Sequence, residues 1–285
     1  MKKWLLLSRP KTLLTGLAPV LLAYSHLSKN SINIDNSLFV LTLICVVLLQ
    51  IGSNIANDLY DGIRGIDTKD RIGPKRSMSS GDISYKKLKQ VTYSIFTTAF
   101  FIGSYISYKS GIEIFFIGLL SIVVAYAYTG GPFPLAYYAL GEFLAFIFFG
   151  VVAVVGVYFI QSQTINLDLW YSACMPGFFS AALMSLNNYR DIYSDKKTKK
   201  KTLAIFIGEK KSKYLTILLI MIGTINGMIL HELSLELIVL PLILSITSIT
   251  FLLKTPHGEN LNKGLGLISF TNLSWCFFIF LSSRI

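Results

Sequence analysis

The sequence predicts an all-α membrane protein with about nine transmembrane helices. Of its 285 residues, 53% are hydrophobic and only 14% are charged, whereas about a quarter of the residues of a soluble domain are charged. Apolar stretches recur along the whole chain, and many approach the roughly 20 residues that cross a bilayer as a helix. The basic residues, finally, are concentrated in alternate loops, as expected for loops on one side of a membrane.

The apolar stretches place the expected helices in chain order. They cover residues 12–28, 38–57, 90–108, 112–128, 139–160, 169–189, 213–230, 235–253 and 265–283. Polar or basic residues, or turn residues, separate each stretch from the next. We expect the whole chain, residues 1–285, to form a single integral-membrane domain.

The distribution of Lys and Arg tests this assignment. Of the 26 basic residues, 23 fall on the side of the N-terminus, and only Lys29, Lys109 and Arg284 fall on the other side. Loops rich in Lys and Arg stay in the cytoplasm. We therefore expect a protein of the cell membrane whose N-terminus is cytoplasmic and whose C-terminus is outside. The basic segments are the N-terminal lead and residues 58–89, 190–213 and 254–264, with four, eight, nine and two basic residues.

The charge and the cysteines exclude other classes. The net charge of +11 does not indicate nucleic-acid binding, because the excess lies in short loops beside apolar segments. The three cysteines, Cys45, Cys174 and Cys276, lie inside apolar segments, so neither a disulfide framework nor a Cys/His metal site is expected. Lys2 and Lys3 precede a short apolar run without a small-residue cleavage site, which favours a cytoplasmic lead over a signal peptide.

Two acidic motifs end the second and sixth expected helices, on the side predicted to be cytoplasmic. They are Asn54-x-x-Asn57-Asp58-x-x-Asp61 and Asn187-x-x-x-Asp191-x-x-x-Asp195. Asn54 and Asn187 are 133 residues apart, as are Asp58 and Asp191, which hints at an internal duplication. Carboxylates beside a membrane helix are costly and usually functional.

The spacing of each motif puts its oxygen atoms on one face of a helix. Asp58 and Asp61 are about one turn apart and would repel each other unless a cation lay between them. Mg²⁺ binds few carboxylates and completes its octahedron with water and phosphate oxygens. Scattered histidines and the lack of an EF-hand spacing disfavour Zn²⁺ and Ca²⁺. The motifs thus predict a site for Mg²⁺ and a diphosphate, with helix caps or solvated loop residues as the alternative.

Basic residues after the motifs have the complementary chemistry. Arg71 and Arg76 flank Gly73-Pro74, a turn that would hold their guanidinium groups in place, and such groups suit a diphosphate. Lys201 is a weaker candidate of the same kind. The alternative for any single lysine is to anchor the loop on the cytoplasmic side.

Tyr126 and Tyr128 lie at the end of the fourth expected helix, just before Thr129-Gly130-Gly131-Pro132. They either belong to the aromatic belt at the membrane interface or line a cavity in which an allylic cation forms. Aromatic faces stabilise such a cation without capturing it.

Taken together, the motifs resemble those of the UbiA-type intramembrane aromatic prenyltransferases, and the resemblance spans nearly the whole chain. That family has an N-D-x-x-D motif after its second helix and a D-x-x-x-D motif after its sixth. Further strings resemble the branch of the family that acts on 1,4-dihydroxy-2-naphthoate. They are Arg9-Pro10-Lys11-Thr12-Leu13, Gly73-Pro74-Lys75-Arg76, Thr129-Gly130-Gly131-Pro132, Leu140-Gly141-Glu142 and Asn187-Asn188-Tyr189-Arg190-Asp191. Five lysines within residues 196–201 depart from the family pattern.

The resemblance implies a helical bundle around a central cavity that opens sideways to lipid. It implies transfer of a polyprenyl group from polyprenyl diphosphate to 1,4-dihydroxy-2-naphthoate, with release of diphosphate and carbon dioxide, to give demethylmenaquinone in menaquinone biosynthesis. Isoprenoid length and oligomeric state are not implied.

The resemblance also implies roles for individual residues. Mg²⁺ would be held by Asp58, Asp61, Asp191 and Asp195. Asn54 and Asn187 would orient water or phosphate oxygens, and Asn57 completes the first motif. Asp67 would either support a metal ligand or contact a substrate. The residues that take up charge on the departing diphosphate would be Arg71, Lys75 and Arg76.

Three other functions are alternatives to this reaction. Within the family, phytyl transfer and other acceptors such as homogentisate or 4-hydroxybenzoate stay open. Asp61-Gly62 begins like the D-G-x-x-A-R string of CDP-alcohol phosphotransferases, but the downstream Ala-Arg is missing. A cation-coupled transporter would carry its acidic residues near the bilayer midplane on broken helices, whereas these motifs end their helices.

Overall fold

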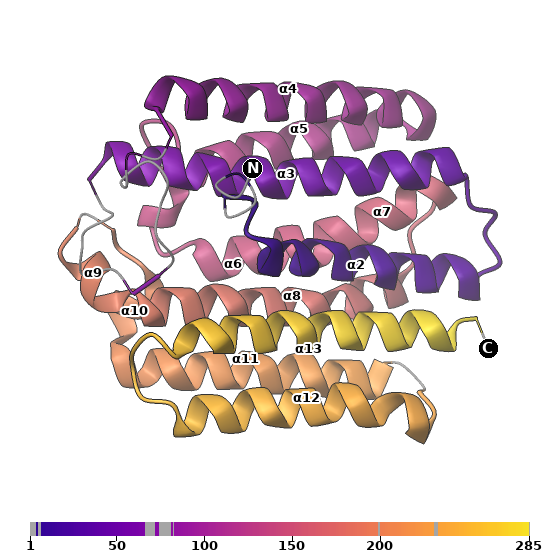
Figure 1. The fold of residues 1–285 in the computed structure, drawn as a ribbon. Coiled ribbons are helices and arrows are strands. Elements are labelled where there is room, and N and C mark those ends of the chain that lie inside the picture. The colour runs from indigo at the N-terminus through magenta and orange to yellow at the C-terminus, as the bar shows by residue number, and fades with distance from the viewer. Residues whose placement is uncertain are drawn as a thin grey trace.

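The computed structural model is a bundle of long helices that run side by side (Figure 1). It describes residues 4, 7–65, 72–73, 81, 83–198, 200–230 and 233–284, and none of these forms a β-strand. The long helices are α2 (Pro10–Lys29), α3 (Asn36–Ile63), α4 (Tyr85–Ser110), α5 (Ile112–Ala127), α7 (Ala153–Ser162), α8 (Leu167–Arg190), α11 (Glu209–Leu230), α12 (Leu235–Lys254) and α13 (Leu261–Ser282). The short elements are η1 (Leu135–Tyr137), α6 (Gly141–Phe146), the π-helical segment η2 (Ile147–Val152), α9 (Ile192–Lys196) and α10 (Leu203–Ile207).

All nine segments that the sequence predicts to be helical are helical, so the all-α membrane class is confirmed. The predicted count of nine membrane-crossing helices is not confirmed. Within the described part of the chain, six helices are long and apolar enough to cross a membrane, and Ile112–Ala127 is a shorter apolar helix. The six are Asn36–Ile63, Gly141–Ser162, Leu167–Arg190, Glu209–Ile229, Leu235–Lys254 and Leu261–Ser282.

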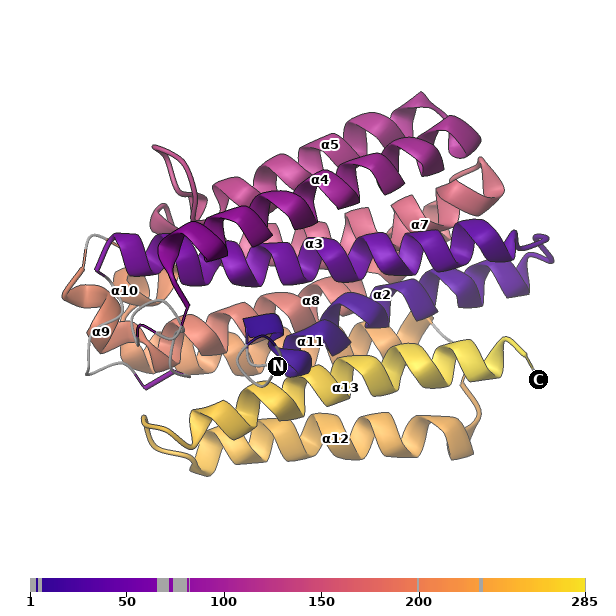
Figure 2. The ribbon, with the colours of Figure 1, turned by 45° about the horizontal axis from the view of Figure 1, so that its top comes forward.

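Both acidic motifs lie at the same end of the bundle. The last turns of α3 and α8 reach this end, where the short helices α9 and α10 also lie (Figure 1). The C-terminus lies at the opposite end, and the view in Figure 2 agrees. The bundle therefore brings together two segments that are about half the chain apart in sequence.

The core of the bundle is built around α8. This helix packs against α6, α11 and α13, and the cluster around it buries Phe179 of α8 and Trp275 of α13 completely. Close approach needs small residues. A Cβ atom on Gly150 would lie 2.5 Å from the Gly177 Cα atom, so only glycine lets the π-helical segment η2 touch α8 here.

Polar side chains join the helices inside the bundle. Three hydroxyl pairs link different helices: Thr15 with Ser269 at 3.3 Å, Ser185 with Thr216 at 2.8 Å, and Ser248 with Thr271 at 3.0 Å. Where lipid surrounds a bundle, such bonds together with close packing hold the helices to one another.

The outer surface is apolar. On α5, Phe116 and Leu120 are 62% and 55% exposed, and on α12, Ile243 and Ile246 are 52% and 53% exposed. Contact of such apolar faces with water is unfavourable, whereas their contact with lipid is favourable. The exposed positions therefore agree with a protein whose long helices lie in a membrane.

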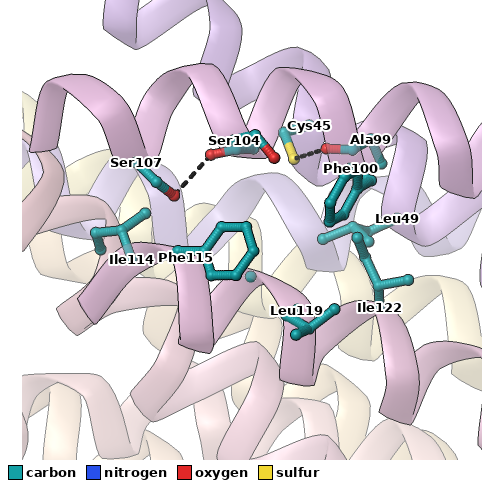
Figure 3. Close-up of a pocket in the computed structure, with 12 residues that line it drawn as sticks. Cys45, Leu49, Ala99, Phe100, Ser104, Ser107, Ile114, Phe115, Leu119 and Ile122 are labelled. Carbon is teal, nitrogen blue, oxygen red and sulfur yellow. Dashed lines mark hydrogen bonds between the residues drawn. The ribbon is translucent and has the colours of Figure 1, made fainter. Parts of the chain in front are cut away.

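A narrow apolar pocket lies between α3, α4 and α5 (Figure 3). It encloses about 30 Å³, which is space for about one water molecule. At its wall the Cys45 thiol donates a weak hydrogen bond to the Ala99 carbonyl at 3.7 Å. All three cysteines are free thiols, as the sequence predicts. The acidic motifs do not line this pocket, so the functional site lies elsewhere.

Candidate active site

The first acidic motif occupies the last turns of α3. The helix continues to Ile63, six residues beyond the predicted end at residue 57, and so carries Asp58 and Asp61. Asn54, Asp58 and Asp61 are buried, with exposures of 5%, 1% and 1%. The prediction that they share a face of one helix is confirmed, because α3 is continuous through Asp61 and their spacing of four and three residues places them on one side of it.

Asn54 fastens this face to the start of the chain. Its amide nitrogen donates to the Ser8 carbonyl at 3.0 Å and to the Thr12 hydroxyl at 3.2 Å. Thr12 belongs to α2, so the amide of Asn54 joins α2 to α3 beside the carboxylates.

The turn after α5 clamps the first motif from the other side. Thr129 donates its hydroxyl proton to Asn57 Oδ1 at 2.7 Å. Arg64 donates to the Thr129 carbonyl and, at 2.7 Å, to the Gly131 carbonyl. Gly131 has a φ of 74°, which glycine adopts without strain. The structure thus uses Asn57 and Arg64 to fix the Gly-Gly-Pro turn against α3.

The second motif differs from its expected conformation. The prediction that Asn187, Asp191 and Asp195 continue one helix is wrong, because α8 ends at Arg190 and Asp191 leaves the helix with φ −93° and ψ 6°. Asp195 belongs to the separate helix α9. The backbone N–H of Asp195 donates to the Asp191 carbonyl at 2.8 Å, which keeps the two aspartates adjacent across the break. Both are buried.

Arg190 anchors Asp191 at this break. Its side chain is 2% exposed and forms a bidentate pair with Asp191, with Nε–Oδ1 and Nη2–Oδ2 distances of 2.9 and 2.7 Å. Its remaining donors reach Asn187 Oδ1 at 2.8 Å and Asn262 Oδ1 at 2.9 Å. In this structure the Asn187 side chain therefore acts as a hydrogen-bond acceptor for Arg190.

Lys200 brings the two motifs together. Its ammonium nitrogen lies 3.3 Å from Asp61 Oδ2 of the first motif and 4.0 Å from Asp195 Oδ1 of the second. The ammonium group is largely buried, with the side chain 13% exposed. Two carboxylates from distant parts of the chain thus face one cation, which is the convergence that the sequence predicts.

The donor set fits Mg²⁺ that arrives with a phosphate ligand. No three His, Cys, Asp or Glu side chains among the described residues form a group that could hold a metal on their own. Mg²⁺ does not need such a cage, because it binds one or two carboxylates and takes its other ligands from water and substrate phosphates. Asp61 and Asp195 offer two oxygens on either side of a cation position.

An aromatic side chain that the sequence analysis missed lies beside this pair. The ring centroid of Tyr137 is 5.9 Å from Lys200 Nζ and 5.4 Å from Arg64 Cζ, within the range of cation–π attraction. Burial first, and then the charge of Asp61, raise the pKa of the Tyr137 hydroxyl to about 12. Tyr137 is therefore a neutral phenol at physiological pH.

The two predicted tyrosines lie in different surroundings. Burial raises the pKa of the Tyr128 hydroxyl above its ordinary value, and three nearby carboxylates raise it further. They belong to Glu142, Asp61 and Asp195. Tyr126 instead shares a hydrogen bond with Tyr60, with 2.7 Å between the hydroxyl oxygens. Tyr128 thus lies within electrostatic reach of both acidic motifs.

Several predicted residues are not placed at this site. Lys201 is exposed, and its neighbour Lys200 occupies the position between the carboxylates. The register of a lysine run cannot be read from composition, so the sequence does not single out Lys200. The residues that lie outside the described part of the chain are Asp67, Arg71, Lys75 and Arg76.

Comparison with known proteins gives one family. Residues 14–273 match the model of the UbiA prenyltransferase family. The chain is 36% identical over 221 residues to a 1,4-dihydroxy-2-naphthoate octaprenyltransferase of Haemophilus influenzae, covering 75% of this chain and 71% of that protein. It is 34% identical over 226 residues to the enzyme of the same name from Escherichia coli, covering 74% and 70%.

Solved structures share the fold. A UbiA homolog from Archaeoglobus fulgidus, bound to DMAPP and Mg²⁺, aligns with a TM-score of 0.65 at 18% identity and covers 98% of this chain and 99% of that one. A UbiA homolog from Aeropyrum pernix K1 in its apo form aligns with a TM-score of 0.72 at 14% identity, covering 94% and 97%. At these identities the likeness concerns the fold.

Proposed function

This chain belongs to the UbiA prenyltransferase family, and we propose that it transfers a polyprenyl group from polyprenyl diphosphate to 1,4-dihydroxy-2-naphthoate. Diphosphate and carbon dioxide leave, and the product is demethylmenaquinol, the two-electron-reduced form of demethylmenaquinone. The observation that carries the proposal is the meeting of Asp61 and Asp195, one from each motif, on a single ammonium group. The names of the relatives support the naphthoate as the acceptor.

The carboxylates would hold a divalent cation together with the diphosphate. In this proposal Mg²⁺ is bound by Asp58, Asp61, Asp191 and Asp195. When bound, Mg²⁺ neutralises charge on the diphosphate and makes it a better leaving group. Lys200 already lies between two of these carboxylates, and its ammonium group would move onto the phosphate oxygens and stabilise the charge that develops there.

Aromatic rings would shelter the organic part of the reaction. As the C–O bond to the diphosphate breaks, the allylic fragment becomes cationic, and the faces of Tyr137 and Tyr128 would stabilise it. The ring carbon that carries the carboxylate then forms the new C–C bond. Loss of carbon dioxide returns its electron pair to the ring, so the step needs no separate base.

An apolar groove supports a place for the isoprenoid tail. It is shallow and wide open to the surface, and it is lined by Leu17 of α2 and four residues of α3. Val47 in this groove and Asp58 are on the same helix, separated by about 16 Å of helix axis. The other lining residues are Leu43, Ile44 and Leu48. A tail lying along α3 would thus extend from the carboxylates toward lipid.

We also infer the orientation in the cell. The end of the bundle that carries both motifs would face the cytoplasm, because 23 of the 26 basic residues lie on that side and basic loops stay inside. The protein would then be a single domain in the cell membrane with its C-terminus outside.

Product analysis tests the function. Purified protein in lipid nanodiscs, given octaprenyl diphosphate, 1,4-dihydroxy-2-naphthoate and Mg²⁺, should form demethylmenaquinol, which mass spectrometry detects as demethylmenaquinone after oxidation by air. Chelation of Mg²⁺ with EDTA should reduce the product to background, and added Mg²⁺ should restore it. Parallel reactions contain phytyl diphosphate, homogentisate or 4-hydroxybenzoate. Prenylation of one of these in place of the naphthoate would reassign the substrate, and cation-driven uptake into liposomes without any prenylated product would refute the transferase.

A further inference from the structure

A further buried carboxylate, outside both acidic motifs, lies at the start of α6. Glu142 is 8% exposed, and its Oε1 accepts a hydrogen bond from the Asn188 amide nitrogen at 3.0 Å. Its other oxygen, Oε2, is buried without a hydrogen-bond partner. A buried acceptor left without a donor is costly. The position therefore calls for a hydrogen-bond donor that the protein itself does not supply.

Gly141, the residue before Glu142, lets polar side chains pack closely here. A Cβ atom on Gly141 would lie 3.0 Å from the Tyr128 hydroxyl and 3.4 Å from the Asn188 amide nitrogen, so the glycine lets both polar groups approach. Tyr128 donates to the sulfur of Met184 at 3.2 Å, which is a weak acceptor. The Tyr128 hydroxyl and the Asn188 amide that holds Glu142 thus both pack against Gly141.

Glu142 lies beside the end of α8 that leads into the second acidic motif. Asn188, the partner of Glu142, precedes Asp191 by three residues on α8, which is about 4.5 Å along the helix axis. Tyr128 is within electrostatic reach of Glu142 and also of Asp61 and Asp195. If the carboxylates of the motifs hold the diphosphate, the allylic carbon bonded to it lies about one helical turn deeper in the bundle, where Glu142 is found.

The chemistry of the two substrates decides which one Glu142 meets. Its oxygen is an acceptor and carries negative charge when ionised, so it repels a diphosphate. A polyprenyl diphosphate has no O–H group on its hydrocarbon part, whereas a hydroxylated aromatic ring has one or more. Only the acceptor brings the donor that Oε2 lacks.

We propose that Glu142 binds a ring hydroxyl of the aromatic acceptor, next to the carbon that is prenylated; this rests on the function proposed above. The hydroxyl donates to Oε2, and the hydrogen bond pushes electron density into the ring at the neighbouring carbon. The C–O bond to diphosphate breaks, and the ring carbon then forms the C–C bond to the allylic cation. The bond to the ring carboxylate then breaks and its electron pair restores aromaticity. The hydroxyl keeps its proton, so Glu142 is unchanged after each turnover.

Glu142→Gln separates this role from a structural one. The glutamine has the same size, and its carbonyl oxygen can still accept from Asn188, but its NH₂ group replaces the acceptor with a donor. We expect kcat/KM for the naphthoate to fall roughly 10–100-fold, with the KM for polyprenyl diphosphate unchanged within about twofold. Glu113→Gln is the matched control, because Glu113 is exposed in the first turn of α5, and it should behave like the wild type.

An acceptor methylated on the hydroxyl beside the reacting carbon provides the second measurement. The wild type should prefer the free hydroxyl roughly 10–100-fold, and Glu142→Gln should lose this preference because its NH₂ group can donate to the ether oxygen. Equal use of both acceptors by the wild type would overturn the inference even if the variant fails to fold. A normal Glu142→Gln enzyme, or one that loses activity on both acceptors equally, would also overturn it while the proposed function stands. No transfer by the wild type to any hydroxylated ring would refute both.

Discussion

Asp61→Asn should lower prenyl transfer about 10²–10³-fold in otherwise intact protein. Asp61 is 1% exposed at the end of α3 and shares the Lys200 ammonium with Asp195. Asparagine keeps the shape of the side chain and can still accept from Lys200, but it removes a negative charge that a divalent cation would need. The rate with polyprenyl diphosphate and naphthoate, measured over a range of Mg²⁺ concentrations, checks the prediction. The concentration that gives half-maximal rate should rise.

A substitution of the same type controls for charge alone. Asp168 is exposed in the first turn of α8, at the opposite end of that helix from the second motif, so Asp168→Asn should retain the full rate. Asp191→Asn should lose activity to a similar degree as Asp61→Asn. Near-normal transfer by both motif variants would show that the acidic motifs do not bind the reacting diphosphate.

Arg190→Ala should destabilise the protein by about 3–5 kcal/mol, the usual cost of breaking a buried ion pair. The arginine is 2% exposed and donates two charge-assisted bonds to Asp191. It also donates to Asn262 at the start of α13. Removing it withdraws these bonds from buried acceptors and loosens the turn that carries the second motif. Thermal unfolding in lipid nanodiscs should show a clear drop in melting temperature, together with lost activity.

Arg190→Lys separates the contribution of the bidentate guanidinium geometry from that of the positive charge. Lysine keeps the positive charge but cannot form the bidentate pair with Asp191 or reach Asn187 and Asn262 at the same time. We expect an intermediate loss of stability. If Arg190→Ala melts at the wild-type temperature, the buried network is not what holds Asp191 in place.

Much of the fold and part of the site could be predicted from the sequence. The spacing of Asn54, Asp58 and Asp61 matches a helix face, and that face is buried in the structure. The end of α8 before Asp191 could not be predicted, because Arg190 follows Tyr189 at what looks like an ordinary basic helix end. Nothing in a one-dimensional pattern distinguishes an arginine that anchors a loop from one that is buried against Asp191.

The residues that were missed depend on contacts between distant segments. Lys200 is one of five similar lysines, and only the path of the chain after α9 selects it to lie between Asp61 and Asp195. Glu142 lies in an apolar segment, and this isolated acidic residue was a usable signal. Its partner Asn188, however, is 46 residues away, so the pairing required the structure.

Binding of a divalent cation is the most direct test of the meeting of the two motifs. Mn²⁺ can replace Mg²⁺ and be followed by electron paramagnetic resonance, with an unreactive polyprenyl thiolodiphosphate present to prevent turnover. If Asp61 and Asp195 share one cation and its diphosphate, Asp61→Asn and Asp195→Asn should each abolish tight Mn²⁺ binding, and the analogue should strengthen binding in the wild type. Undiminished Mn²⁺ binding in either variant would contradict a shared site.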